Sequence, residues 1–193
     1  MEDKIMKVMR TYETETSTYE VGDVIAFELE GGEKVEAMAM RQEADCMLFL
    51  FVDCLKDEEC MNEEDSNRGG FDASDLRMKL NCEIIERFPA EIREQMVAFA
   101  NGDMLRLPTE KEIFGVNEYG EDEGEVEQFA PMKLRRNRIA FQGLNGNWEW
   151  YWLANKHKRS ASYFARVTYA GLATYYCAST AHGVRPAFKI KNL

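Results

Sequence analysis

Residues 162–190 have the sequence SYFARVTYAGLATYYCASTAHGVRPAFKI, and this stretch decides which fold the chain is expected to adopt. Three segments of strand length contain β-branched and aromatic residues, namely 162–168, 172–179 and 184–190. Short turns rich in small residues separate the three segments. In the last segment alternate apolar residues share one face, and Pro186 favours an edge or bulged position. The stretch therefore predicts three neighbouring strands that form a C-terminal β-meander.

The first third of the chain also has the patterns of β-strands. Residues 24–29 and a segment ending near Met40 are expected to form two strands joined by a turn at Gly31 and Gly32. The run MLFLFVDCL, residues 47–55, is apolar almost throughout. Such a run predicts a strand that is buried on both faces.

The middle of the chain has the spacing of amphipathic helices. After an acidic loop, Asp72 or Ser74 is expected to cap a helix with apolar residues at every fourth position. These apolar residues are Leu76, Leu80, Ile84 and Phe88. A second helix is expected to begin at Pro89 and to stop at Asn101-Gly102. Its apolar stripe would consist of Ile92, Met96 and Phe99.

A short further helix is expected within RLPTEKEIFG, residues 106–115. Thr109 and Glu112 predict a capping box at its start, and Gly115 predicts its end. Taken with the strands, the pattern predicts an α+β fold with two central helices and antiparallel sheets. The polar residues 1–18 are expected to form a flexible arm, followed by a single domain over residues 19–193.

Composition and charge argue against several classes of function. The net charge of −11 makes a nucleic acid an unexpected partner, because the positive surface typical of such proteins is missing. No apolar run is long enough to span a bilayer, and the start of the chain lacks the features of a cleaved export signal. We therefore expect no membrane span and no signal peptide.

Motifs for cofactors and metal ions are also missing. The sequence has no P-loop, Rossmann glycine pattern, HExxH, GxSxG or EF-hand. The spacing of Cys46, Cys54 and Cys60 matches no common zinc module, and the odd number of cysteines fits reduced thiols. We expect neither a cofactor nor a metal site.

Three short motifs resemble the formylglycine-generating, sulfatase-modifying enzymes. RLPTEKE (106–112) resembles the RLPTEAEWE signature of that family, GNWEW (146–150) resembles its GNVWEW, and GVRP (183–186) resembles its closing GFR strand. The motifs also follow one another in the order of the family. The resemblance implies a C-type-lectin-like fold of the formylglycine-generating type.

A wider resemblance, from about Gly22 to the end, is to uncharacterised domains of Gram-positive gut bacteria and their prophages. Those domains share a GD-x-[IV]-x-F strand, an S-x-LR-x-x-LN helix and a WLRSP…GVRPA region. Here the corresponding sequences are GDVIAF (22–27), SDLRMKLN (74–81) and 152–188, with Ala154-Asn155-Lys156 in place of RSP. Receptor-binding proteins diversified by retroelements use the same lectin-like fold. The resemblance implies a binding or display role, in the cytoplasm or in released phage particles.

Thiol chemistry is the first alternative that the sequence leaves open. Cys177 lies five residues before His182, one of only two histidines. The formylglycine-generating enzymes use a pair of C-terminal cysteines, whereas Cys177 stands alone in this region. A thiolate also needs a base and an orienting group, which the spacing does not supply. We expect Cys177 to be a small packing residue and the protein not to be an enzyme.

A recognition surface is the function that the sequence favours. Residues 147–164 place aromatic side chains beside the basic run 156–159, and tyrosines follow. Tyr and Trp provide large contact areas at small entropic cost. Trp148 and Trp150 correspond to core tryptophans of the family and are expected to be structural. We expect a protein or glycan ligand over residues 155–182, bound by Tyr151, Asn155, His157, Arg159, Tyr163, Tyr169, Tyr175 and His182.

Two further expectations concern charged residues. Arg185 lies inside an apolar strand and is expected to be structural, with its guanidinium on backbone carbonyls or a carboxylate. The acidic segment 117–128 is expected to be a solvated loop. In a second alternative function, this loop would contact a basic partner of an intracellular interaction domain.

Overall fold

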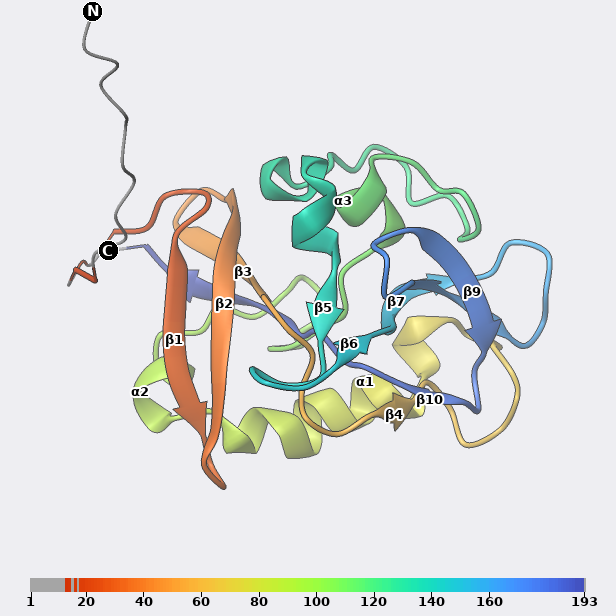
Figure 1. The fold of residues 1–193 in the computed structure, drawn as a ribbon, viewed down its shortest axis with the longest axis horizontal. Coiled ribbons are helices and arrows are strands. Elements are labelled where there is room, and N and C mark those ends of the chain that lie inside the picture. Colours follow the sequence, from red (N-terminus) through yellow and green to blue (C-terminus); the bar gives the residue numbers. More distant parts are fainter. Residues whose placement is uncertain (1–12, 15, 17, 193) are drawn as a thin grey trace, which may run out of the picture.

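The computed structural model describes residues 13–14, 16 and 18–192. The flexible arm expected over residues 1–18 lies almost entirely outside the described residues. The fold combines helices and strands, with short antiparallel strands predominating (Figure 1). The helices of the described part of the chain lack the length and apolar character needed to cross a membrane.

The first sheet contains four antiparallel strands in the order β1-β2-β3-β11. They are β1 (Val24–Leu29), β2 (Glu33–Gln42), β3 (Cys46–Phe51) and β11 (Ala187–Lys191). Gly31 and Gly32 join β1 to β2 with φ angles of 92° and 84°, a left-handed conformation that glycine adopts readily. All six residues of β3 are buried. The predicted hairpin and the strand buried on both faces are therefore confirmed.

The second sheet contains three antiparallel strands in the order β7-β8-β9. They are β7 (Tyr151–Lys156), β8 (Tyr163–Val167) and β9 (Ala173–Cys177). Two smaller pairs complete the β-structure: β4 (Glu59–Cys60) with β10 (Ala181–His182), and β5 (Ala140–Phe141) with β6 (Trp148–Glu149).

The prediction of a three-stranded C-terminal meander is wrong in its last strand. β8 and β9 pair as expected, but β11 crosses to the first sheet and pairs with β3. The ring of Phe188 lies 5.7 Å from that of Phe49 and 5.5 Å from that of Phe88. Burying this aromatic side chain in the core favours the distant β3 over the adjacent hairpin strand. Pro186, as expected, precedes a strand at the edge of its sheet.

The first predicted helix is confirmed as a continuous helical segment over residues 75–87. Its parts are α1 (Asp75–Lys79), η2 (Leu80–Ile84) and η3 (Ile85–Arg87), and the extended residue Ser74 separates it from the 3-10 turn η1 (Phe71–Ala73). The hydroxyl of Ser74 accepts a hydrogen bond from the Arg77 amide, so Ser74 is the cap of α1. The predicted apolar residues of this helix are all buried.

The second predicted helix is much shorter than expected. α2 (Ala90–Arg93) ends well before Asn101. Beyond it the chain runs beside β11: the Val97 amide donates to the Lys189 carbonyl, and the Lys191 amide donates to the Gln95 carbonyl. These bonds satisfy the outer edge of β11 and compete with helix formation.

The third predicted helix, α3 (Glu110–Phe114), has both predicted ends. Thr109 and Glu112 form the capping box, and Gly115 is left-handed at the C-terminus. Two 3-10 turns follow, η4 (Ala130–Lys133) and η5 (Arg135–Arg138).

Both sheets separate two clusters of buried side chains. Phe49 of β3 and Trp152 of β7 belong to one cluster, whereas Leu50 and Leu153, their neighbours in sequence, belong to the other. Because neighbouring residues of a strand face opposite ways, β3 and β7 are covered on both faces. The edge strands β1 and β9 are more exposed.

Candidate ligand-binding surface

The β7-β8-β9 sheet divides the expected site residues between its two faces. In the β8–β9 pairing, Tyr163 lies opposite Cys177 and Phe164 lies opposite Tyr176. Since side chains alternate along a strand, Tyr175 shares the face of Tyr163, and Tyr176 points the other way. The two adjacent tyrosines therefore belong to different surfaces.

The face of Tyr175 carries four rings, which we name the Tyr119 cluster: Tyr119, His157, Tyr163 and Tyr175. The centroid of the Tyr175 ring lies 5.0 Å from Tyr119, 4.6 Å from His157 and 5.4 Å from Tyr163. Burial, and then the charge of Lys158, lowers the pKa of His157 below its ordinary value of 6.5. The cluster thus joins three expected ligand residues to Tyr119 around a neutral histidine.

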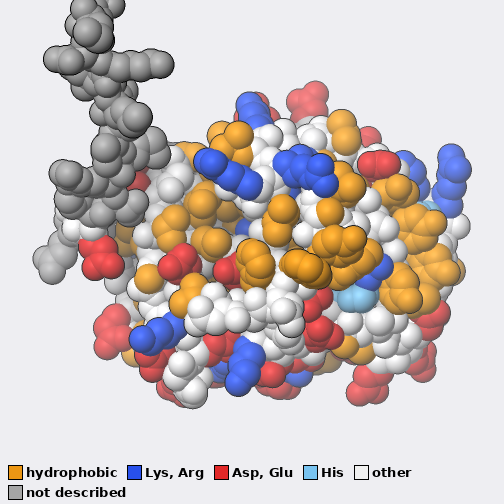
Figure 2. Space-filling view, viewed as in Figure 1, with side chains coloured by type: hydrophobic (Ala, Val, Ile, Leu, Met, Phe, Trp, Pro, Cys, Tyr) orange, Lys and Arg blue, Asp and Glu red, His pale blue; other side chains and the backbone are white. Residues whose placement is uncertain are grey.

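The opposite face carries a second group, which we name the Arg166 surface. Its members are Trp148, Trp150, Arg166, Tyr169, Tyr176 and His182. Cζ of Arg166 lies 4.1 Å from the ring centroid of Trp150 and 4.2 Å from that of Tyr176, so the guanidinium contacts an aromatic ring of each residue. Figure 2 shows hydrophobic side chains gathered over β6 and β9, with a histidine beside them.

The outer part of the Arg166 surface is formed by exposed aromatic rings. Trp148, Tyr169 and Tyr176 are 63%, 46% and 44% exposed. The Tyr169 ring lies 5.8 Å from that of Trp148 and 5.5 Å from that of Trp150. Trp150 contacts both Tyr169 and Arg166, and Arg166 contacts Tyr176, so the exposed rings belong to one connected surface. Aromatic side chains exposed in this way mark a place where a partner could bury apolar area.

The structural role expected for Trp148 is wrong. Glu149, and not Trp148, takes the buried position of β6, and Trp148 lies outward beside Phe141. Side chains alternate along a strand, so the two residues of β6 point in opposite directions. Glu149 points into the protein and Trp148 into solvent. Trp150 is half-buried and contacts Arg166 through its ring.

Arg166 is a buried cation with few polar partners. The residue is 7% exposed, and its Nη1 lies 2.5 Å from Nε2 of His182. Its Nε is buried without a hydrogen-bond partner, and no carboxylate of the described residues forms an ion pair with it. Burial lowers the pKa of Arg166 to about 10, so the guanidinium remains charged at neutral pH.

Two titratable groups beside Arg166 have shifted pKa values of opposite sign. Burial, and then a hydrogen bond with Glu58, raises the pKa of Glu149 from 4.5 to about 7. Burial, and then the charge of Arg166, lowers the pKa of His182 from 6.5 to about 3. His182 is therefore neutral at pH 7, and its Nε2 accepts a hydrogen bond from Nη1 of Arg166. The His182 ring lies 4.8 Å from that of Trp152.

Two expected ligand residues lie inside the molecule. Tyr151 is fully buried, and its hydroxyl donates to the Arg138 carbonyl at 3.0 Å. Asn155 is 8% exposed and holds α3 in place, because its carbonyl oxygen accepts from the Glu110 amide at 2.7 Å. Both side chains are occupied by the fold. Arg159 is exposed on the loop after β7, outside the two ring groups.

Arg185 makes the backbone contacts expected of a structural arginine. It is 1% exposed, and its Nε donates to the Phe51 carbonyl at 2.9 Å. Its Nη1 donates to the Tyr151 hydroxyl at 3.0 Å, and both terminal nitrogens reach the Asn137 carbonyl. Arg185 thereby connects β3 of the first sheet to β7 of the second.

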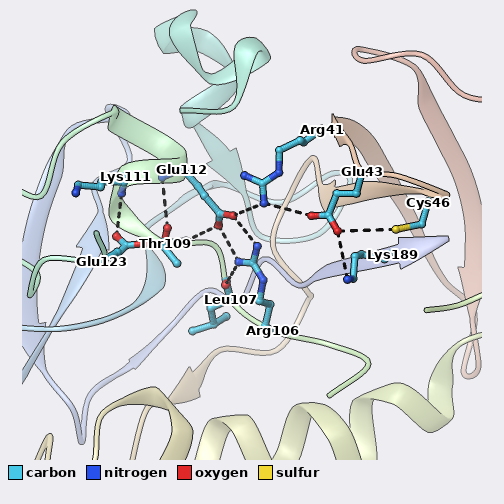
Figure 3. Close-up of polar contacts among 10 residues, drawn as sticks. All are labelled: Arg41, Glu43, Cys46, Arg106, Leu107, Thr109, Lys111, Glu112, Glu123 and Lys189. Atoms are coloured by element: carbon cyan, nitrogen blue, oxygen red, sulfur yellow. Dashed lines mark hydrogen bonds and ion pairs between the residues drawn. The ribbon is translucent and has the colours of Figure 1, made fainter. Parts of the chain in front are cut away.

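The RLPTEKE motif forms a network of ion pairs (Figure 3). Glu112 is 2% exposed and accepts from Arg106 at 2.6 and 2.7 Å and from Arg41 at 3.3 Å. Burial alone would raise the pKa of Glu112, but Arg106, Thr109 and Arg41 together lower it below 4.5. Figure 3 shows the network continuing through Glu43 to Lys189 of β11. This arrangement links α3 to the first sheet and is structural.

The acidic segment 117–128 is a largely solvated loop, as expected, and is held to the protein at a few points. The Glu110 carboxylate accepts from the Gly120 amide at 2.7 Å. A carboxylate oxygen of Glu123 accepts from the Asn155 side chain at 2.8 Å and from the Lys111 amide at 3.1 Å. Glu123 is thus used within the fold, whereas the other acids of the loop are exposed: Glu118, Glu121, Asp122, Glu125 and Glu127.

Cys177 and His182 do not form a thiol–imidazole pair. Cys177 lies on the face of Tyr163, whereas the His182 ring lies 5.4 Å from that of Tyr176 on the other face. Within the described residues, no three His, Cys, Asp or Glu side chains are grouped so that they could hold a metal ion.

These observations define a β-rich domain with a built aromatic and arginine surface at one end. Residues 45–192 match the model of a family described as a domain of unknown function, DUF6273. The match covers more than half of the chain, and the protein belongs to this family. No curated protein and no solved structure matches the chain. β1 and β2 lie before the matched segment, although they complete the first sheet.

Proposed function

We propose that this domain is a non-enzymatic binding module whose Arg166 surface contacts a protein ligand, with a carboxylate of that ligand placed on Arg166. One observation carries the proposal. Arg166 is a buried cation in contact with two aromatic rings, without a carboxylate partner among the described residues. Glu149 lies near enough to interact with this charge, but its pKa of about 7 leaves it only partly ionised at neutral pH. Keeping a cation without an ion pair at such a position costs stability, which a structural role does not require.

The physical chemistry of this surface favours a protein partner. A carboxylate from outside would supply the missing counter-charge, and burial around the contact would strengthen their attraction. The rings of Trp150 and Tyr176 already restrict the guanidinium, so less side-chain entropy is lost on binding. Trp, Tyr and Arg are also the residues that most often dominate the binding energy of protein interfaces.

The sequence resemblances support a finer proposal for the fold and its use. The order of RLPTEKE, GNWEW and GVRP favours a C-type-lectin-like fold of the formylglycine-generating type. The likeness to domains of gut bacteria and prophages favours a display role for such a fold. Residual thiol chemistry at Cys177 is the weaker alternative, because His182 is engaged with Arg166.

Selection of peptides on the immobilised protein tests the proposal. The probe is a phage-displayed library of random peptides, with an array of neutral and acidic glycans as the second arm. We expect enrichment of peptides with Asp or Glu beside apolar residues. Trp148→Ala should lower the affinity for the selected peptides at least tenfold, because it removes an exposed aromatic side chain of the Arg166 surface. The fold should be kept, since Trp148 lies outside the core.

Met78→Ala is the matched control, since Met78 is 61% exposed on α1, outside the Arg166 surface. This variant should bind as the wild type does. Selected peptides that bind Trp148→Ala and wild type equally would contradict the proposed surface. Binding of glycans without enrichment of peptides would contradict a protein as the ligand class.

A further inference from the structure

β9 is an edge strand that pairs with β8 alone. The Thr168 amide donates to the Leu172 carbonyl, and the Ala178 amide donates to the Ser162 carbonyl. These bonds fix which residues of the β8–β9 ladder are hydrogen-bonded pairs, because such pairs alternate with unbonded ones in antiparallel sheets. The backbone N–H and C=O groups of Ala173, Tyr175 and Cys177 accordingly point away from β8.

This edge lacks the features that normally prevent an edge strand from pairing with a strand of another chain. Native proteins protect such edges with Lys, Pro, inward charges or bulges. The sequence of β9 is ATYYC, and residues 167–184 contain no Asp, Glu, Lys or Arg. The β8–β9 register is continuous over the whole strand. Tyr175 and Tyr176 are 37% and 44% exposed, and β9 lies at the opposite end of the molecule from the β1–β2 hairpin (Figure 1).

We propose that β9 pairs antiparallel with β9 of a second copy of this chain, about a two-fold axis at Tyr175. In this register the Tyr175 residues of the two copies face each other, and Ala173 of each copy faces Cys177 of the other. The outward groups of Ala173 and Tyr175 and the Cys177 amide are spaced symmetrically about Tyr175 and meet complementary groups. The Cys177 carbonyl already accepts from the Thr180 amide of its own chain, and the new bond would share it. The two three-stranded sheets then form one continuous sheet.

The uncharged edge is where a second copy of this acidic chain meets the least repulsion. Each chain carries a net charge of −11, so two copies repel one another over most of their surfaces. The uncharged stretch 167–184 allows close approach without placing like charges side by side. An acidic ligand of the kind proposed for Arg166 uses the other face of the sheet, and the pairing of β9 does not rest on that proposal.

The pairing would set the two Arg166 surfaces on one face of the joined sheet. Tyr176 and Thr174 point to this face in both copies, since side chains of a continuous sheet keep their alternation. A two-fold dimer would therefore present two ligand sites in a fixed relation, and a ligand that carries repeated epitopes would bind it with increased avidity.

Light scattering coupled to size-exclusion chromatography tests the pairing. The wild-type chain at tens of micromolar should have the mass of a dimer. Tyr175→Pro removes an outward N–H but no bond to β8, so it should give a folded monomer, as judged by circular dichroism. Tyr175→Phe keeps the N–H and the ring, and should remain a dimer. Ala173→Lys gives a second route to the monomer by adding charge to the edge.

Cross-linking tests the register. Under mild oxidation, Ala173→Cys should form disulfides between the introduced thiol and Cys177 of the second copy. Within one chain these positions are about 13 Å apart along a strand, beyond the reach of a disulfide. Thr174→Cys, on the other face, should not cross-link to Cys177.

A monomeric wild type at all concentrations, or a dimer that persists in both Tyr175→Pro and Ala173→Lys, would overturn the proposal. If the wild type is monomeric and Tyr175→Pro abolishes binding of the selected peptides, the edge accepts an extended peptide instead of a second copy. Either result leaves the test of Trp148→Ala unaffected, so failure of the pairing is distinct from failure of the proposed function.

Discussion

The region around Arg185 and the Arg166 surface each contain a buried arginine, and the two are bonded very differently. Arg185 is 1% exposed and donates to Phe51, Tyr151 and Asn137. Arg166 is 7% exposed, rests between aromatic rings and keeps a buried Nε without a partner. Burial alone therefore does not identify a structural arginine. A guanidinium satisfied by its own chain holds the fold, whereas one left unsatisfied is available to a partner.

Loss of Arg185 should produce the largest effect. Arg185→Ala leaves the carbonyls of Phe51 and Asn137 without their buried donor and removes the link between the two sheets. We expect the free energy of unfolding to fall by about 3 kcal/mol. For a chain of this size, that corresponds to a melting temperature lower by about 6–12 °C, measured by differential scanning calorimetry.

Arg185→Lys serves as the control for charge. A single ammonium cannot reach both the Phe51 carbonyl and the Tyr151 hydroxyl in the geometry of a guanidinium, so this variant should recover only part of the loss. An unchanged melting curve for Arg185→Ala, together with lost ligand binding, would reverse the roles assigned to the two arginines.

Replacement of Arg166 should have a much smaller effect on stability. Arg166→Met removes the stacking on Trp150 and the bond to His182, but it also removes a desolvated charge without a counter-ion. We expect the free energy of unfolding to stay within about 1 kcal/mol of the wild type. Peptide binding should be lost while the melting temperature is nearly kept. A loss of stability as large as that of Arg185→Ala would mean that Arg166 is structural.

The titration of Glu149 and His182 should produce small, opposing changes of stability with pH. The raised pKa of Glu149 means that the folded state keeps a proton that the unfolded state loses, so stability falls as pH rises from about 4.5 to about 7. The lowered pKa of His182 means that the unfolded state binds the extra proton, so stability rises with pH between about 3 and 6.5. Between about pH 4.5 and 6.5, the contributions of Glu149 and His182 to the free energy of unfolding change in opposite directions and offset each other.

Single variants should separate these two contributions. Glu149→Gln should leave stability that rises with pH between about 4.5 and 6.5, whereas His182→Gln should leave stability that falls with pH over the same window. Urea unfolding at a series of pH values measures both slopes. Identical pH profiles for the two variants would contradict the assigned environments beside Arg166.

Local patterns predicted several elements correctly because neighbouring residues determine them. The Gly31-Gly32 turn, the Ser74 cap and the Thr109 capping box each depend on a few adjacent positions. The path of β11 and the early end of α2 depend on contacts distant in sequence, between Phe188 and Phe49 and between Val97 and Lys189. The residue pattern within β11 or α2 does not indicate which distant residues the segment will contact.

The candidate site could be predicted only in part for the same reason. The aromatic composition of residues 147–182 predicted the region in which both ring groups lie, and the two-residue period of a strand could have separated Tyr175 from Tyr176. Arg166 lies inside an apolar strand, as Arg185 does, and this signal could have drawn attention to it. Its lack of a carboxylate partner is a property of the tertiary structure and does not appear in the sequence.

Arg166 is proposed to contact the ligand, whereas Arg185 holds the fold. The most direct test measures the melting temperatures of Arg166→Met and Arg185→Ala, and the affinity of each variant for the same selected acidic peptide. Isothermal titration calorimetry at a temperature where both variants are folded gives the affinities. We expect Arg166→Met to melt close to the wild type and to lose binding, whereas Arg185→Ala should melt at a lower temperature and still bind. Undiminished binding by folded Arg166→Met would show that Arg166 does not contact the ligand.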